Sequence, residues 1–175
     1  MLIIILASVA ALVLGIVVLA ATKPKTFRYQ RRATIAAAPE KVVALLNDFR
    51  QWSEWSPWEK LDPAMQRTHS GAAAGVGAVY EWSGNKKAGS GRMEILVNTP
   101  TLVKIQLDFI APFKAHNFTE FSVVANGAVS DVVWEMYGES PLVSRIMSVF
   151  INLDKLIGKD FEAGLVNLNR LASAS

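Results

Sequence analysis

The feature that most constrains this chain is an uninterrupted apolar block at its start. Residues 2–21 carry no charge, and only Ser8 and Gly15 interrupt the run of aliphatic side chains. A helix of this length spans about 30 Å at about 1.5 Å per residue, which matches the hydrocarbon core of a bilayer. Such a helix satisfies its own backbone hydrogen bonds in lipid. We therefore predict a transmembrane anchor over residues 1–22.

A cleaved signal peptide is the alternative interpretation of this block, because its end, Leu19-Ala20-Ala21, would fit a cleavage site. Signal peptides usually begin with a positive region and have a shorter apolar core. No Lys or Arg precedes the block here, and the block is long. These two features favour an uncleaved anchor.

Basic residues gather directly behind the block. Five of the 18 lie there: Lys23, Lys25, Arg28, Arg31 and Arg32. Without them the chain has 13 basic and 15 acidic residues, so its folded part lacks the basic surface of a nucleic-acid-binding domain. A Lys/Arg excess on one flank favours the cytoplasmic side for that flank. We expect a single-pass protein of a bacterial-type inner membrane, with a cytoplasmic domain and with membrane lipid as a partner. The basic segment could also contact anionic headgroups, but the favoured interpretation is that it only sets the topology.

Cysteine is absent, which excludes disulfides, thiolate zinc sites and a cysteine nucleophile. His69 and His116 lie far apart and form no metal-binding motif, whereas a zinc site needs at least three convergent protein ligands. We expect no metal and no cofactor.

Alternating residues after the basic segment predict a strand over residues 27–35. The stretch 23–34 thus joins the basic juxtamembrane segment to the first strand, and the folded domain is expected over 27–172. Pro39 follows three alanines and suits the first turn of a helix. A Trp-rich stretch, residues 52–58, predicts a second short helix that ends near Ser56. We expect its Trp side chains to cap the core rather than form a membrane-interface belt.

From residue 65 to 138 the apolar period becomes two, and turn-forming Gly, Asn and Pro separate the segments. This pattern predicts an antiparallel meander with strands at 65–70, 77–82, 91–97, 102–109, 114–124 and 129–137. From 141 to 171 the apolar period returns to 3.6, which predicts one helix of about 30 residues and about 45 Å. The fold class is therefore α+β.

The order of these elements resembles the helix-grip fold of the START-related SRPBCC superfamily, in particular its polyketide cyclase/dehydrase-like branch. The resemblance covers about residues 28–171. It is carried by Ala-Pro-Glu-Lys-Val near residues 37–42, the Trp cluster, Gly77-x-x-Tyr80-x-Trp82-x-Gly84, Trp134-Glu135-Met136-x-Gly138, and Gly158-Lys159-Asp160-Phe161-Glu162-Ala163-Gly164-Leu165. It implies a curved sheet that grips the long C-terminal helix, with an apolar cavity between them.

Pleat alternation and helical spacing assign residues to that cavity. The expected lining is Tyr80, Trp82, Met93, Ile95, Leu107, Asn117, Thr119, Phe121, Trp134, Met136, Phe150, Ile157 and Phe161. Asn117 and Thr119 would be its polar groups. The alternative is that the same side chains fill a core at normal density.

Three functions remain open at this point. The first is a membrane-anchored binding module for a hydrophobic small molecule such as a lipid, an isoprenoid or a polyketide. The second is a cyclase- or dehydratase-type enzyme, although no catalytic constellation is recognisable. The third is a protein-interaction domain with a filled core. The sequence predicts no oligomeric state.

Overall fold

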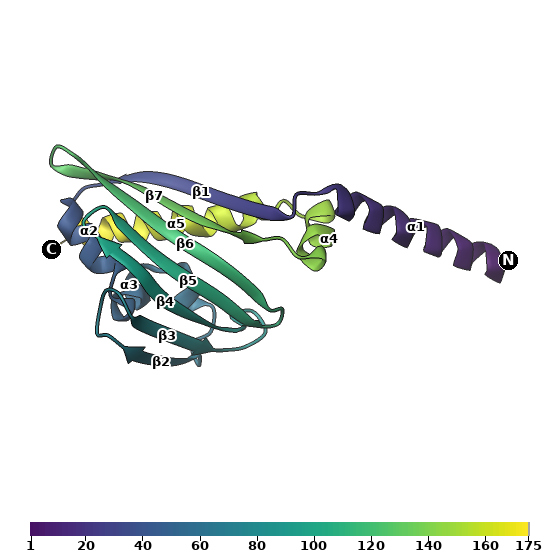
Figure 1. The fold of residues 1–175 in the computed structure, drawn as a ribbon, viewed down its shortest axis with the longest axis horizontal. Helices are drawn as coiled ribbons and strands as arrows, with labels where there is room; N and C mark the ends of the chain where they lie inside the picture. Colours follow the sequence, from purple (N-terminus) through teal and green to yellow (C-terminus); the bar gives the residue numbers. More distant parts are fainter. Residues whose placement is uncertain (175) are drawn as a thin grey trace.

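The computed structural model describes residues 1–174 (Figure 1). A projecting helix leads into a sheet that curves around the C-terminal helix. The elements, in chain order, are α1 (Leu2–Thr22), β1 (Thr26–Ile35), α2 (Pro39–Leu46), η1 (Phe49–Gln51), α3 (Trp52–Trp55), η2 (Pro57–Lys60), β2 (Gln66–Gly71), β3 (Ala78–Ser83), β4 (Ser90–Thr99), β5 (Leu102–Ala111), β6 (Ala115–Asn126), β7 (Val129–Glu139), α4 (Leu142–Phe150) and α5 (Leu153–Ser173).

Helix α1 projects away from the sheet (Figure 1), and it is long and apolar enough to cross a bilayer. None of its most apolar stretch is buried against the rest of the chain. A core helix of a soluble protein would be mostly covered. The exposure of α1 is therefore what a membrane anchor or a signal sequence would show.

The seven strands form one antiparallel sheet in the order β1-β7-β6-β5-β4-β3-β2. Strand β1, the first in sequence, pairs with β7, the last, from Thr26↔Glu139 to Ile35↔Ser130. The other neighbours are consecutive hairpins, so the predicted meander is confirmed. A register shift between Ile95 and Val97 interrupts the β4–β5 pairing, and such bulges bend and twist a sheet. The predicted α+β helix-grip architecture is confirmed, with α5 lying across the sheet.

The C-terminal helix differs from the sequence prediction of one continuous helix. It breaks into α4 and α5, because Ile151 is extended (φ −126°, ψ 132°). Asn152 then caps α5 by accepting a hydrogen bond from the Lys155 backbone N–H at 2.9 Å, the usual role of Asn at a helix start. The apolar spacing continues across the break, which is why periodicity alone did not reveal it.

The Trp-rich segment lies inside the domain, as predicted. Trp52 and Trp55 are 4% and 0% exposed. Their indole N–H groups donate to the carbonyl oxygens of Leu46 and Leu45, at 3.1 and 3.3 Å. The indoles therefore tie α3 to the end of α2, and their polar edges are satisfied as buried Trp requires.

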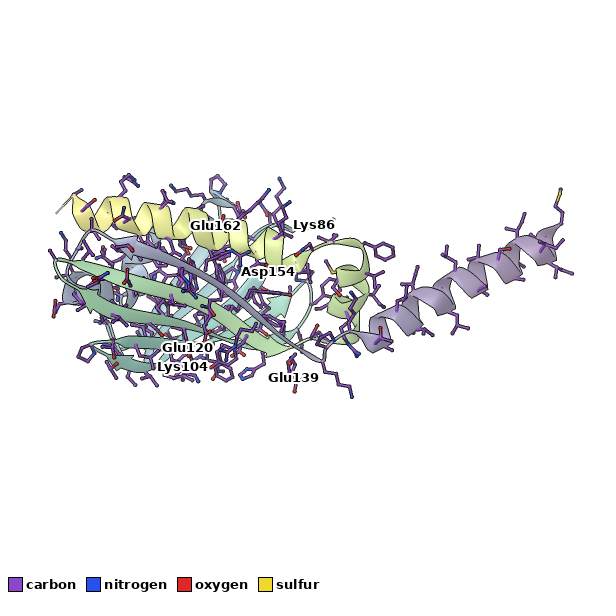
Figure 2. All side chains as sticks on the ribbon, turned by 90° about the horizontal axis from the view of Figure 1, so that it is seen from above. Lys86, Lys104, Glu120, Glu139, Asp154 and Glu162 are labelled. Carbon is purple, nitrogen blue, oxygen red and sulfur yellow. The ribbon has the colours of Figure 1, made fainter. Side chains whose placement is uncertain are left out.

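Arg31 of β1 fastens α5 to the edge of the sheet. Its guanidinium donates to Glu162 at 2.8 Å and to both carboxylate oxygens of Asp154 at 3.1 Å. Figure 2 shows both acids on α5, above the sheet. Gly158 lies between them in sequence, and a Cβ there would come within 1.9 Å of the Arg31 guanidinium. The glycine thus lets the arginine lie flat against the helix.

The double variant Gly158→Ala/Arg31→Ala is expected to differ from the sum of the two single variants by about 1–2 kcal/mol in the free energy of unfolding, because an alanine side chain at 158 would contact Arg31. Alanine at 158 displaces Arg31 in the wild-type background. Without Arg31 it should gain up to about 1 kcal/mol from helix propensity. Denaturant unfolding in detergent of wild type, the two single variants and the double variant measures this difference. Gly164→Ala, which would instead press on Trp134, is the control and should add independently to Arg31→Ala. Equal effects of Gly158→Ala in both backgrounds would contradict the proposed contact.

Candidate ligand-binding cavity

A cavity of about 380 Å³ lies between the inner face of the sheet, the Trp-rich segment and α5. Its walls are mostly aromatic and aliphatic, and a few polar groups converge on it. The lining comprises Trp52, Ser56, Trp58, Glu59, Leu61, Met65, Tyr80, Trp82, Lys87, Ala88, Met93, Leu107, Phe109, Thr119, Trp134, Met136, Leu156, Ile157, Asp160 and Phe161. An apolar cavity of a few hundred Å³ with few polar groups is typical of small-molecule sites.

Tyr80 and Glu59 form the main polar pair in this wall. The Tyr80 hydroxyl donates to Glu59 Oε1 at 2.6 Å, and Arg67 Nε donates to Glu59 Oε2 at 2.7 Å. Burial, reinforced by the hydrogen bond to Glu59, raises the pKa of Tyr80 well above its ordinary value. The phenol therefore stays protonated at neutral pH, and its one O–H remains engaged with Glu59.

Thr119 and Trp134 form a second polar contact at the cavity wall. The Trp134 indole N–H donates to Thr119 Oγ1 at 2.9 Å, and the threonine hydroxyl donates to the Glu135 carbonyl at 2.9 Å. The only donor of Thr119 is thus already engaged. This pair orients the indole ring, and it leaves little capacity for a ligand.

The rim of the cavity carries its remaining charged groups. Asp160 on α5 and Lys87 in the β3–β4 turn both line it, beside the exposed side chains of Leu61 and Leu156. Burial raises the pKa of the Asp160 carboxyl. The rim is therefore the part of the site that offers free polar groups to a ligand.

Nine of the thirteen residues predicted from the sequence line the cavity: Tyr80, Trp82, Met93, Leu107, Thr119, Trp134, Met136, Ile157 and Phe161. Ile95 and Phe121 face inward as predicted, but both are fully buried in the packed core and do not line the cavity. The rings of Trp52, Trp55 and Trp134 surround Phe121. That these residues bind a ligand stays a prediction.

Asn117 and Phe150 are placed differently from the prediction. Asn117 is 4% exposed on the inner face, between Leu107 and Gly138 on the neighbouring strands, but it does not line the cavity. Its Oδ1 is buried without a hydrogen-bond partner among the described residues. Phe150 is 67% exposed, because the break after α4 carries it away from α5.

Sequence reasoning missed the side of the cavity that has no strand or long helix. Glu59, Leu61, Met65 and Lys87 come from η2 and loops, where no periodicity assigns a direction to a side chain. Asp160 was missed for another reason, since it was read only as part of the family motif. Its separation of four residues from Leu156 and three from Ile157 would have placed it on the same face of α5.

The fold and the cavity together define a helix-grip protein with a space for an apolar ligand. Residues 26–173 match the family model "Polyketide cyclase / dehydrase and lipid transport". The chain therefore belongs to this family. Comparison with curated protein sequences gives no match.

Solved structures show the same fold at low sequence identity. The Zhui aromatase/cyclase from Streptomyces sp. R1128 has a TM-score of 0.60 at 15% identity, over 85% of this chain and 94% of that one. The di-domain ARO/CYC BexL from the BE-7585A biosynthetic pathway has 0.62 at 12%, over 91% and 54%. The Aha1 dimer from Colwellia psychrerythraea has 0.57 at 14%, over 82% and 93%. These similarities support the fold alone.

Asp160→Asn should stabilise the protein at pH 7 relative to wild type. The raised pKa means that the folded state favours the protonated acid, so wild type loses stability as pH rises from below 3.8 through the folded pKa. Asparagine cannot ionise and avoids that loss. Thermal melts at pH 7 and below pH 3.8 test this, and the difference should vanish at the lower pH. Glu162→Gln, an exposed partner of Arg31 on the same helix, is the control and should not stabilise. An unchanged difference at both pH values would contradict the assignment.

Proposed function

We propose that this chain is a membrane-anchored binding module for a hydrophobic small molecule. The observation that carries the proposal is the apolar cavity of about 380 Å³ between the sheet and α5. Burying a ligand there removes apolar surface from water, which contributes about 25 cal/mol per Å². A lipid, an isoprenoid or a polyketide-like molecule has the required apolar body, and the family description includes lipid transport.

The polar groups suggest how such a ligand would lie. Tyr80 is engaged with Glu59, and Thr119 with Trp134. The free charged groups, Lys87 and Asp160, are at the rim. A ligand with an apolar tail and one polar head would therefore place its tail inside and its head at the rim.

An enzyme of cyclase or dehydratase type is the second candidate. One observation favours it: the Asp160 carboxyl lines the cavity with a raised pKa, as general acids in enzymes often have. No second titratable group forms a dyad with it in the hydrogen bonds of the described residues. Incubation of the loaded protein followed by mass spectrometry separates the two, because a dehydratase would release a product lighter by one water.

The third candidate, an interaction domain with a filled core, would leave no room for a ligand. The cavity counts against it, although Ile95 and Phe121 belong to a packed region beside the cavity. No nucleic-acid partner is proposed, because the excess of basic over acidic residues comes from the five that lie next to α1.

Ile157→Trp should weaken binding of an environment-sensitive fluorescent fatty acid at least about tenfold, or roughly 1.4 kcal/mol. The larger ring would occupy the cavity that Ile157 lines. Val166→Trp, on the same helix but 69% exposed, is the matched control and should bind like wild type. Titration of detergent-extracted protein measures both. A wild-type protein that never binds the probe and carries no small molecule in native mass spectrometry would eliminate the proposal.

The proposed topology puts α1 across the membrane and the domain in the cytoplasm, because the neighbouring Lys/Arg excess favours that side. A reporter that functions only in the cytoplasm should be active when it is fused after the C-terminus. A paired reporter that is active only outside should be silent. Activity of the outside reporter would reverse the orientation. A mature protein that begins near Thr22 would remove the anchor.

A further inference from the structure

Apart from α1, helix α4 is the apolar element that the fold leaves most exposed. None of its residues is buried. Its exposed large side chains are Leu142, Val143, Met147 and Phe150, and the next residue, Ile151, is exposed as well. Residues 143, 147 and 150 recur at helical spacing, so they share one face. A soluble domain gains nothing from an uncovered apolar helix face.

The position of α4 relative to α1 indicates what covers this face. Helix α4 packs against α1, and Ala20 is the residue of α1 that becomes buried. Ala20 lies within the last turn of the apolar block. If α1 spans a bilayer, any element packed on that turn lies at the boundary between acyl chains and headgroups. Figure 1 shows α4 at the foot of α1, between it and the sheet.

A second apolar feature lies at the same end of the domain. Ile110 and Phe113, at the β5–β6 connection, are 54% and 60% exposed. The neighbouring Lys114 lines a surface groove together with Thr26 and Pro141, which brings this connection close to the start of β1 and the start of α4. Both apolar features therefore face the side from which α1 leaves.

Basic groups outnumber acids in the groove beside α4 and would complement an anionic lipid surface, while Glu139 lines the neighbouring groove and Arg28 pairs with Glu135 at 3.1 Å. A groove of about 570 Å³ between α4, β1 and the start of α5 is lined by Lys23, Arg28 and Arg145, with Asp154 as its one acid. Arg145 is the only charged residue of α4, and its buried Nε has no hydrogen-bond partner among the described residues. An apolar helix face beside basic groups is the pattern of helices that lie in a membrane interface.

We infer that α4 and the β5–β6 connection form a membrane-docking face, which seats the domain on the bilayer surface at the foot of α1. The occupant is the headgroup and upper acyl region of the bilayer. The inference rests on α1 being the anchor of the proposed function. Beyond that anchor, the domain itself would contact the bilayer surface through these two elements. Phe109, which lines the cavity, directly precedes Ile110, and Leu156, which also lines it, lies in the first turn of α5, six residues after the end of α4. Docking would therefore hold that side of the cavity close to lipid.

Depth-dependent quenching tests this face, because the chain has no cysteine and single cysteines can be labelled with an environment-sensitive dye. Phe150→Cys, Phe113→Cys, Leu12→Cys and Val166→Cys would be placed in full-length protein. The vesicles contain equal parts of phosphatidylcholine and phosphatidylglycerol. The quencher is on the upper acyl chain for the labels at 150, 113 and 166, and near the end of the acyl chain for the label at 12, which lies in the middle of α1. Labels at 150 and 113 should lose at least about half of their emission, as expected for an interfacial helix. The exposed control at Val166 should stay unquenched.

The Leu12 label separates this inference from the anchor. Quenching at 12 without quenching at 150 and 113 would overturn the docking face and leave the anchor intact. A label at 12 that stays outside lipid would overturn both.

A second variant tests whether α4 seats the domain. Met147→Glu with Phe150→Glu should abolish quenching of the Phe113 label, because the charges oppose burial of α4 in lipid. Both positions are exposed, so binding of the fatty-acid probe in detergent should remain and show that the domain is folded. Undiminished quenching at 113 in this variant would overturn the role of α4. Loss of probe binding by wild type would instead count against the cavity proposal and not against docking.

Discussion

The stacking of Trp134 on Phe161 is the contact on which the grip of sheet on helix depends. The two rings are 4.3 Å apart and nearly parallel, with an interplanar angle of 3°. Trp134 also contacts Trp55 and Trp58, so one side chain joins β7, the Trp-rich segment and α5. Gly164 leaves the space for it, since a Cβ there would come within 2.7 Å of the indole. Aromatic rings bury much apolar area in fixed geometries, which keeps the cavity beside them open rather than collapsed.

The sequence predicted the sheet well because side chains of a strand alternate between two faces. Once one face is buried, a shift of the strand by one residue would expose every apolar side chain, so the pattern specifies the strand closely. All six later strands were found within a few residues, and nine of the thirteen predicted lining residues line the cavity. Most of the failures share a cause, Asp160 being the exception. The extended Ile151 and the loop residues Glu59 and Lys87 owe their positions to tertiary packing, and no periodic pattern records it. Asn117 has the predicted face and lies opposite Leu107, which lines the cavity, yet Asn117 itself does not line it; alternation assigns a face of the sheet but not the extent of a cavity on it.

The break at Ile151 also explains why one half of the apolar stripe packs against the sheet while the other half does not. The α5 half of the stripe meets the sheet through Phe161, Leu165 and Leu168, all essentially buried. The α4 half turns away from the sheet and remains exposed. A continuous helix would have carried α4 along the axis of α5, whereas the capped break sets its direction separately. Family membership alone would not reveal this division, since it describes residues 26–173 as one unit.

The link between α1 and the sheet has a consequence for reach. Only residues 23–25 separate the end of α1 from β1, and three extended residues cover about 10 Å. Pairing with β7 starts at once, at Thr26. With α1 in a bilayer, this short linker would keep the domain within about 10 Å of the membrane surface. The domain could then not carry a ligand to a second membrane. On the proposed function, a ligand would therefore be taken up and released at one membrane surface, and any acceptor would have to come to it.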